Sequence, residues 1–215
     1  MVTISYWQRL LRWLTHEDAS YLFATTTERM RQTAPAPSPQ YRMVLCTTQN
    51  LAEMQHALEN FPPVIAEGMA HGDLAILAVA EGHIIARASA VLGPQRYQAF
   101  GHEFTLGETE AYIENVETET AWREQGVAHA VITRLADELH ARGMRDVCLL
   151  VHIKNTPSIH LFEKCGCTRR GVLISRRVFG HWQSQLAVLG GLLLATTQFR
   201  ALLYWTRLSA FILEN

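Results

Sequence analysis

The sequence predicts a mixed α/β (α+β) fold, in which a central sheet is flanked by helices and extra helices lie at both ends of the chain. Three observations predict it. Strand-like and helix-like segments alternate along the middle of the chain. The clearest helix runs from Gly126 to Gly143, because its apolar residues recur every four positions (Val127, Val131 and Leu135). A continuous apolar run over 145–153 then has the pattern of a buried strand.

The other elements follow from their local patterns, and glycine and proline mark several of their ends. Before residue 109, we expect a strand over 41–48, a helix over 50–61 that Pro62 and Pro63 end, two strands joined at Glu81 and Gly82, and a loop without a clear period over 94–108. A strand over 110–120 then precedes the helix and the strand described above. Asn155, Thr156 and Pro157 open a short helix, and at least one more strand follows within 169–180.

Both ends of the chain differ from this middle part. Residues 1–32 predict an amphipathic helix, since apolar residues fall at helical spacing from Ile4 to Leu14, and the proline-rich stretch 33–40 is a linker. Residues 183–215 predict an apolar helical tail. Its uninterrupted apolar run, Leu186 to Ala195, is half of what a bilayer span requires, so an interfacial or partner-packed helix fits better. The domain between the two ends covers 41–182.

Composition excludes several classes of function. The formal net charge of −1 gives no general attraction to nucleic acid. The four cysteines form no CxxC pair and the ten histidines no metal-binding spacing, so we expect reduced thiols and no metal. The N-terminus lacks the pattern of a secretory signal, because Arg9 and Arg12 interrupt its apolar residues. We therefore expect a cytoplasmic protein, with the inner face of a membrane as the alternative.

The start of the long helix carries the first chemical signal. There the chain reads R-x-x-G-x-A, with Arg123, Gly126 and Ala128 at the fixed positions. Glycine allows the backbone to approach a ligand closely, and the free amides of a first helical turn favour an anion such as a pyrophosphate. Taken alone, the pattern is that of an ordinary helix cap.

A second motif, further along the chain, makes the first one more specific. The strand at 145–153 leads into "NTPSIHLFEKCGC", Asn155 to Cys167. Together, the strand, R-x-x-G-x-A, helix, strand and N-x-x-S-x-x-L-F-x-K-x-G resemble the GNAT superfamily of acyl-CoA-dependent N-acyltransferases. The resemblance is clear over 110–171 and extends over 41–180. It implies a mostly antiparallel sheet and acetyl-CoA as the acyl donor.

The resemblance also implies a donor site, position by position. The loop would hold the pyrophosphate, the preceding strand would meet the pantetheine arm, and the later helix would flank the thioester. These positions are Arg123, Glu124, Gln125, Gly126, Val127 and Ala128 for the loop, Val116 and Thr118 for the strand, and Asn155, Ser158 and Phe162 for the later helix.

Two positions depart from the family's pattern. The family commonly has a tyrosine where this chain has Phe162, and its hydroxyl can protonate the leaving thiolate. Phe162 has no proton to give, so water or another group must supply it. The usual Gly-Phe after the helix is Gly166-Cys167 here, which alters packing.

The reaction needs a group that takes the proton of the attacking amine. The candidate catalytic residues are Glu114, Glu117 and Asn155. Strict strand alternation would put Glu117 and Glu119 on one side of the sheet and Glu114 on the other. The two glutamates have alternative interpretations, as solvated strand residues or as acids that only bind a cation. A histidine could also take the proton, and His152 lies close to Asn155, but the favoured interpretation of His152 is a core histidine bonded to backbone.

The sequence thus predicts an N-acetyltransferase that moves an acetyl or other short acyl group from coenzyme A to a primary amine on a small molecule or peptide. The segments 61–73 and 94–108 would select the acceptor. The alternative is a membrane-surface or protein-interaction module with a degenerate acyl-CoA site. We expect no nucleic acid partner. The terminal helices would form a homodimer or make a peripheral membrane contact through tryptophan and arginine.

Overall fold

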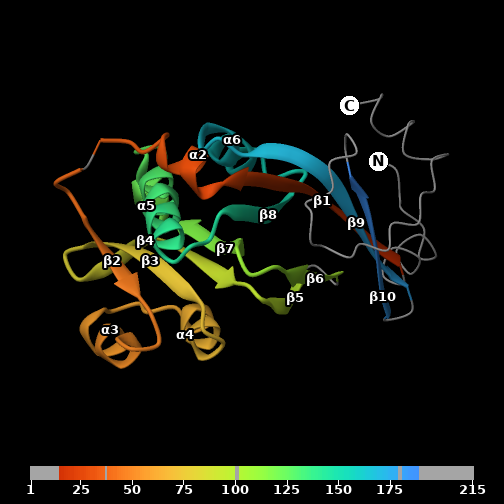
Figure 1. The fold of residues 1–215 in the computed structure, drawn as a ribbon. Helices are drawn as coiled ribbons and strands as arrows, with labels where there is room; N and C mark the ends of the chain where they lie inside the picture. The colour runs from red at the N-terminus through yellow and green to blue at the C-terminus, as the bar shows by residue number, and fades with distance from the viewer. Residues whose placement is uncertain (1–14, 37, 100–101, 179–180, 189–215) are drawn as a thin grey trace, which may run out of the picture.

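The computed structural model describes residues 15–36, 38–99, 102–178 and 181–188 of the chain (Figure 1). The strands are β1 Thr15–Thr26, β2 Arg42–Cys46, β3 Leu74–Ala80, β4 His83–Leu92, β5 Gln95–Ala99, β6 His102–Leu106, β7 Glu110–Thr118, β8 Asp146–His152, β9 Thr168–Val178 and β10 His181–Val188. The helices are α2 Thr27–Arg31, α3 Leu51–Ala57, α4 Pro63–Ala70, the short 3-10 helix η1 Thr120–Trp122, α5 Val127–Ala141 and α6 Thr156–Lys164.

One large sheet organises the described residues. Its eight strands lie in the order β10-β9-β1-β8-β7-β4-β3-β2. Only β7 and β8 run parallel, and every other neighbouring pair is antiparallel. The predicted mixed fold with a mostly antiparallel central sheet is therefore confirmed.

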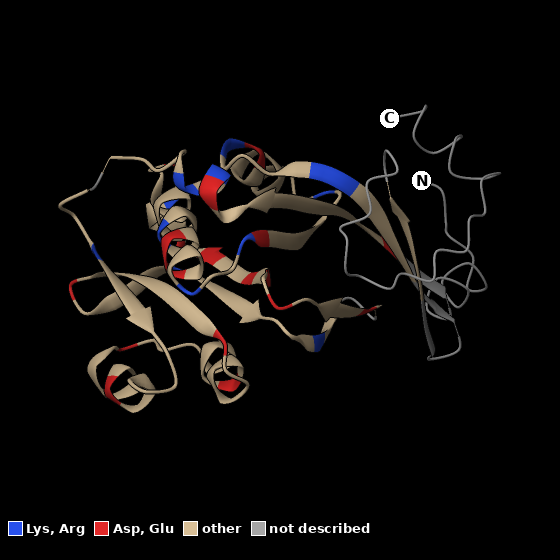
Figure 2. Cartoon of the chain, in the orientation of Figure 1, with Lys and Arg blue, Asp and Glu red and all other residues tan. Residues whose placement is uncertain are grey.

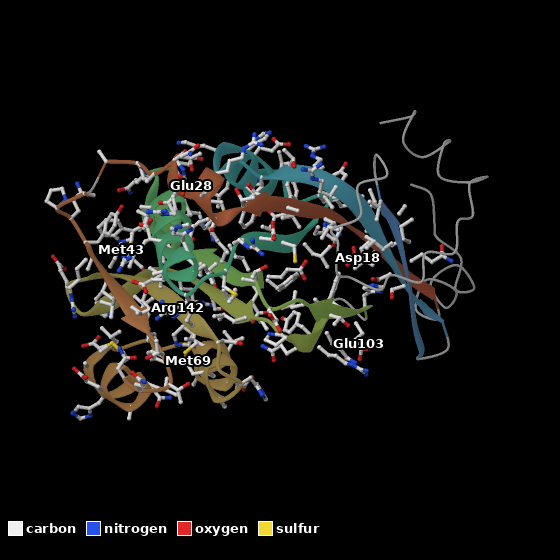
Figure 3. The ribbon with its side chains drawn as sticks, in the orientation of Figure 1. Asp18, Glu28, Met43, Met69, Glu103 and Arg142 are labelled. Carbon is white, nitrogen blue, oxygen red and sulfur yellow. The ribbon has the colours of Figure 1, made fainter. Side chains whose placement is uncertain are left out.

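Helices cover the two faces of this sheet (Figure 1). Helices α2, α5 and α6 lie over one face, and α3 and α4 lie over the other. Side chains alternate between the two faces along a strand, so β3 contributes to the apolar layer on each face. Leu74 and Ile76 pack in the layer beneath α5, whereas Ala75 and Leu77 pack beneath α3 and α4. Figure 3 shows the same division, with Met43 and Met69 on opposite sides of the sheet.

The N-terminal segment differs from the prediction. The expected helix over 1–32 is wrong for residues 15–26, which form strand β1 between β8 and β9. The segment "THEDASYLFATT" is rich in threonine and aromatic residues, which favour strands, and pairing with two neighbours decides its structure. Residues 4–14, whose spacing predicted the helix, lie outside the described part of the chain.

The segment 94–108 also differs from the expected loop. It forms the hairpin of β5 and β6, a two-stranded sheet separate from the large one. Apolar side chains alternate with polar ones in both short strands, and the ring of Tyr97 packs 4.9 Å from that of Tyr112 on β7. Phe104 lies 6.0 Å from the same ring. The hairpin thus covers the face of β7 that α5 does not.

The predicted C-terminal helix is wrong at its start. Residues 181–188 form β10, which pairs with β9 from His181 opposite Val178 to Val188 opposite Gly171. Pairing with a long neighbouring strand explains why the apolar pattern forms a strand there. The rest of the tail lies outside the described residues, as do the predicted dimer and membrane contacts of the terminal helices. No helix of the described residues has the length and apolar character that crossing a bilayer requires.

Candidate functional site

The two parallel strands separate near the middle of the sheet. They pair only at their first residues, where Glu110 to Tyr112 of β7 lie opposite Asp146 to Cys148 of β8. Both strands continue beyond this point, β7 to Thr118 and β8 to His152, and the described residues form no further pairs between them. Their carboxyl ends therefore diverge, and each leads toward one helix, α5 or α6.

The connection from β7 to α5 exposes a series of backbone amides. Two of its residues are left-handed, Glu124 with φ 63° and Gly126 with φ 79°. Within the described chain, the amides of residues 124 to 128 donate to no acceptor, and the helical bonding of α5 starts when Ala130 N–H donates to Gly126 O at 3.0 Å. Successive free amides of this kind form a concave donor set for an anion. Their position at the start of a 15-residue helix adds the positive end of its dipole.

Side chains of the same loop hold its shape. Arg123 Nε donates to the carbonyl of Thr118 at 3.1 Å, and Gln125 Nε2 donates to that of Ala121 at 2.8 Å. Arg123, Glu124 and Gln125 are exposed, whereas Val127 is buried in the core and offers only its amide. Ala128, half-buried, completes the predicted set. The loop residues predicted from the sequence thus lie together at the carboxyl end of β7.

A bulge in β7 changes which face its acidic residues occupy. Glu114 lies opposite Ser89 of β4, and Glu117 lies opposite Arg87. These two pairs are three residues apart on β7 but only two residues apart on β4, so β7 contains one extra residue. Asn115, with φ 53°, is the left-handed residue of this irregularity. Glu114 and Glu117 therefore share one face, and the expectation that they lie on opposite sides is wrong because it assumed strict alternation.

The two glutamates have different partners. Glu117 forms an ion pair with Arg87, whose guanidinium is the more buried partner. Glu114 accepts a hydrogen bond from the hydroxyl of Tyr97 in β5 and another, at 2.8 Å, from the side-chain amide of Asn115. Glu117 is thus neutralised by a cation, while Glu114 is held by neutral donors alone. Both candidates lie on the face that the β5–β6 hairpin partly covers.

A third carboxylate on this face was not predicted as a site residue. Asp73 directly precedes β3 and is 6% exposed. Within the described chain its side chain has no hydrogen-bond partner, and its Oδ1 is fully buried. Burial, and next the charge of Glu114, raise the pKa of Asp73 to about 7. The sequence placed Asp73 only at the end of the segment 61–73 that was expected to select the acceptor, and it gave no signal for the residue itself, because an aspartate between a helix and a strand is an ordinary turn residue.

The polar side chains at the end of β8 form hydrogen bonds with other groups of the protein. Asn155 caps α6, accepting from Ser158 N–H at 3.2 Å. His152 lies 2.5 Å from Asp18 of β1 through Nε2, and its Nδ1 accepts from Lys154 N–H. His152 is therefore part of the contact between β1 and β8, with a side chain 34% exposed, rather than a buried core residue.

Among the predicted cofactor-contacting residues of β7 and α6, Phe162 is buried, and Val116 and Thr118 are half-buried. Phe162 is 4% exposed and packs 6.5 Å from the ring of Phe23 in the α5 layer. Its expected place beside a thioester is therefore not open to solvent. Val116 packs partly against the same layer, and the hydroxyl of Thr118 is buried with no partner within the described chain. At Val116 and Thr118, a ligand would therefore contact backbone groups of the strand rather than side chains.

On the face of the sheet that α3 and α4 cover, the segment joining these two helices borders a surface cavity of about 530 Å³. Asn60 lies in its wall, and its side chain bonds both Ile84 and Glu119. Within the described part of the chain, no three His, Cys, Asp or Glu side chains gather into a metal-ion site.

Comparison with known proteins connects this geometry to a family. The sequence model of the "Acetyltransferase (GNAT) family" matches residues 41–167. Among solved structures, a GCN5-related N-acetyltransferase-like protein from Streptococcus suis is similar over 84% of this chain and 69% of its own, at 16% identity and a TM-score of 0.55. A functionally unknown conserved protein from Staphylococcus epidermidis is similar over 81% and 67%, at 9% identity and a TM-score of 0.53. At these identities the likeness shows the fold alone. Among curated proteins, none matches.

Proposed function

Because the chain belongs to the GNAT family of acetyltransferases, we propose that it transfers an acetyl or other short acyl group from coenzyme A to a primary amine. The observation that carries the proposal is the set of free amides over residues 124–128, beside the point where β7 and β8 diverge. The family implies the donor, and the amine acceptor is our inference.

The loop after β7 would hold the diphosphate of the donor. Its free amides, the dipole of α5 and the guanidinium of Arg123 all favour negative charge. The unpaired edge of β7 around Val116 and Thr118 would then meet the pantetheine arm, which would direct the thioester toward Asn155 and Ser158. These assignments rest on the resemblance as well as on the position of the loop.

The transfer itself requires a neutral amine. A carboxylate takes one proton from the ammonium, the nitrogen attacks the thioester carbonyl, the C–N bond forms, and the C–S bond breaks. The departing thiolate takes up the remaining proton through water, since Phe162 has none to give. Glu114 is the better base, because Glu117 is already paired with Arg87. A backbone amide near the bulge would stabilise the oxyanion.

We predict thiol release from acetyl-CoA when the full chain is given a panel of primary amines. Replacing Glu114→Gln should lower kcat by about a hundredfold or more, since a positioned base contributes about 10²–10⁴. The matched change Glu117→Gln should lower it less than tenfold. Thiol release is followed optically, and mass spectrometry identifies the acylated amine.

Two results would contradict the proposal. One is acetyl-CoA binding with no turnover of any amine, which would favour an interaction module with a degenerate site. The other is equal loss in both variants, which would refute the assignment of the base to Glu114.

A further inference from the structure

We propose that Asp73 and Glu114 together bind the ammonium group of the acceptor, so that the acceptor is a cationic aliphatic amine. This inference rests on the proposed function, since it names the substrate class of the same site. It assigns a binding role to Asp73, which neither the sequence motifs nor the family match single out.

The two carboxylates lie on one face of the sheet. Glu114 lies opposite Ser89 of β4, and the next strand, β3, pairs with β4 through Leu74 opposite Ala90. Asp73 precedes Leu74, and Ala75, two residues further on, packs beneath α3 and α4. Asp73 is therefore on the side of the sheet that also carries Glu114.

No cation of the described chain neutralises this pair. Asp73 has no donor, and Glu114 has only the neutral donors Tyr97 and Asn115. Arg87 is paired with Glu117. The sequence from Met43 to Ala86 contains no lysine or arginine but five acidic residues, and Figure 2 shows acidic residues and no basic ones on α3 and α4. Positive charge must therefore come from outside this segment.

Burial makes the absence of a partner informative. A carboxylate buried without a hydrogen bond is unfavourable, and natural proteins rarely keep one without a reason. Helix α4 leaves room for it, because a Cβ on Gly68 would lie 2.7 Å from Asp73 Oδ2. An ammonium group would supply both the missing charge and the missing donors. Such charge-assisted bonds are strongest where water is excluded.

The test is a calorimetric titration of the full chain with 1,4-diaminobutane, without acetyl-CoA. We expect saturable binding by the wild type and no binding of 1,4-butanediol, which has the same length and no charge. Asp73→Asn should weaken the diamine's affinity by about tenfold or more, because a hydrogen bond to a charged group is lost. Glu114→Gln should act in the same direction. Glu28→Gln, which changes an exposed glutamate of α2 over the other face of the sheet, should change affinity less than twofold.

Affinity should also rise between pH 6 and pH 8 in the wild type, since Asp73 ionises in this range while the diamine stays protonated. The groups that face Asp73 from other strands are Glu114 and Tyr97, with the Arg87–Glu117 pair on the same face. Asp73→Asn should remove most of this pH dependence. If it does not fold, by circular dichroism, Glu114→Gln alone decides the question.

The outcomes separate the two proposals. Diamine binding that depends on Asp73, with no affinity for acetyl-CoA, keeps the ammonium site and overturns the proposed transfer reaction. Binding of acetyl-CoA with diamine affinity unchanged in Asp73→Asn and Glu114→Gln overturns the ammonium site alone. Absence of diamine binding by the wild type also overturns it.

Discussion

The buried carboxylate of Asp73 should reduce the stability of the free protein. Its pKa is raised from 3.8 to about 7, so the folded state prefers the protonated acid while the unfolded chain ionises. Stability is therefore greatest below the unfolded value and is lost as the pH rises from about 4 to about 7. The shift corresponds to about 4 kcal/mol by linkage. A protein keeps such a cost where function requires it.

This predicts that Asp73→Asn stabilises the protein, and more so at higher pH. The gain in the free energy of unfolding should be about 2 to 3 kcal/mol larger at pH 8 than at pH 5, because asparagine does not ionise. Urea denaturation at the two pH values measures it, with the exposed Glu108→Gln as the control. A gain that is the same at both pH values, or a loss of stability, would contradict the account of Asp73.

At the scale of elements, the main feature is strand β1. It lies outside the 41–167 match to the family, yet it occupies an interior position of the sheet and pairs on both sides. Phe23, fully buried, and the pair of Asp18 with His152 fix it against β8 and the α5 layer. Figure 3 shows Asp18 on this strand. The domain therefore needs residues from before the linker, and a chain starting after Pro35 would lack a central strand.

We predict that one proline distinguishes this interior strand from the β5–β6 hairpin. Ala24 lies opposite both Cys148 and Thr168, so Ala24→Pro should cost about 3 kcal/mol or more. Ala99 pairs only with His102, at the end of the two-stranded sheet, and Ala99→Pro should cost much less. Denaturant midpoints measure both. Equal losses would mean that β1 is not an interior strand.

The elements that were predicted correctly are those whose information is local. Helix α5 was expected over 126–143 and runs from Val127 to Ala141, because its apolar period and Gly143 act within one segment. The turn between β3 and β4 was expected at Glu81 and Gly82, and both residues have positive φ. Gly82 favours that conformation by its identity, whereas Glu81 adopts it because a tight turn of two residues requires it.

The features that were missed depend on contacts far apart in the sequence. Strand β1 pairs with residues at least 120 positions away, which no pattern within Thr15–Thr26 reveals. The bulge at Asn115 moved Glu114 to the face of Glu117, and one irregular residue suffices for such a change. Asp73 became a candidate only when three strands brought it to Glu114. The donor loop could be predicted because its motif is continuous, whereas the acceptor side is assembled from separate strands.

Over the whole molecule, charge is distributed in a way that suits two different substrates. Helices α3 and α4 carry acidic residues without basic ones, whereas α2, α5, α6 and β9 carry lysine or arginine (Figure 2). An anionic donor near α5 and a cationic acceptor near α4 would each meet favourable charge. The diverging ends of β7 and β8 connect the two sides.

The central claim is that the loop at Gly126 binds the diphosphate of an acyl donor, and a pair of substitutions tests it most directly. Gly126 has φ 79°, and a Cβ at this residue would meet no other part of the described chain within 4 Å. Asn and Asp both tolerate this conformation, so they differ there mainly in charge. Calorimetric titration with acetyl-CoA should show saturable binding by the wild type and by Gly126→Asn. Gly126→Asp should bind about a hundredfold more weakly than Gly126→Asn, because its carboxylate would repel the diphosphate. Equal affinity of the two variants would contradict the claim.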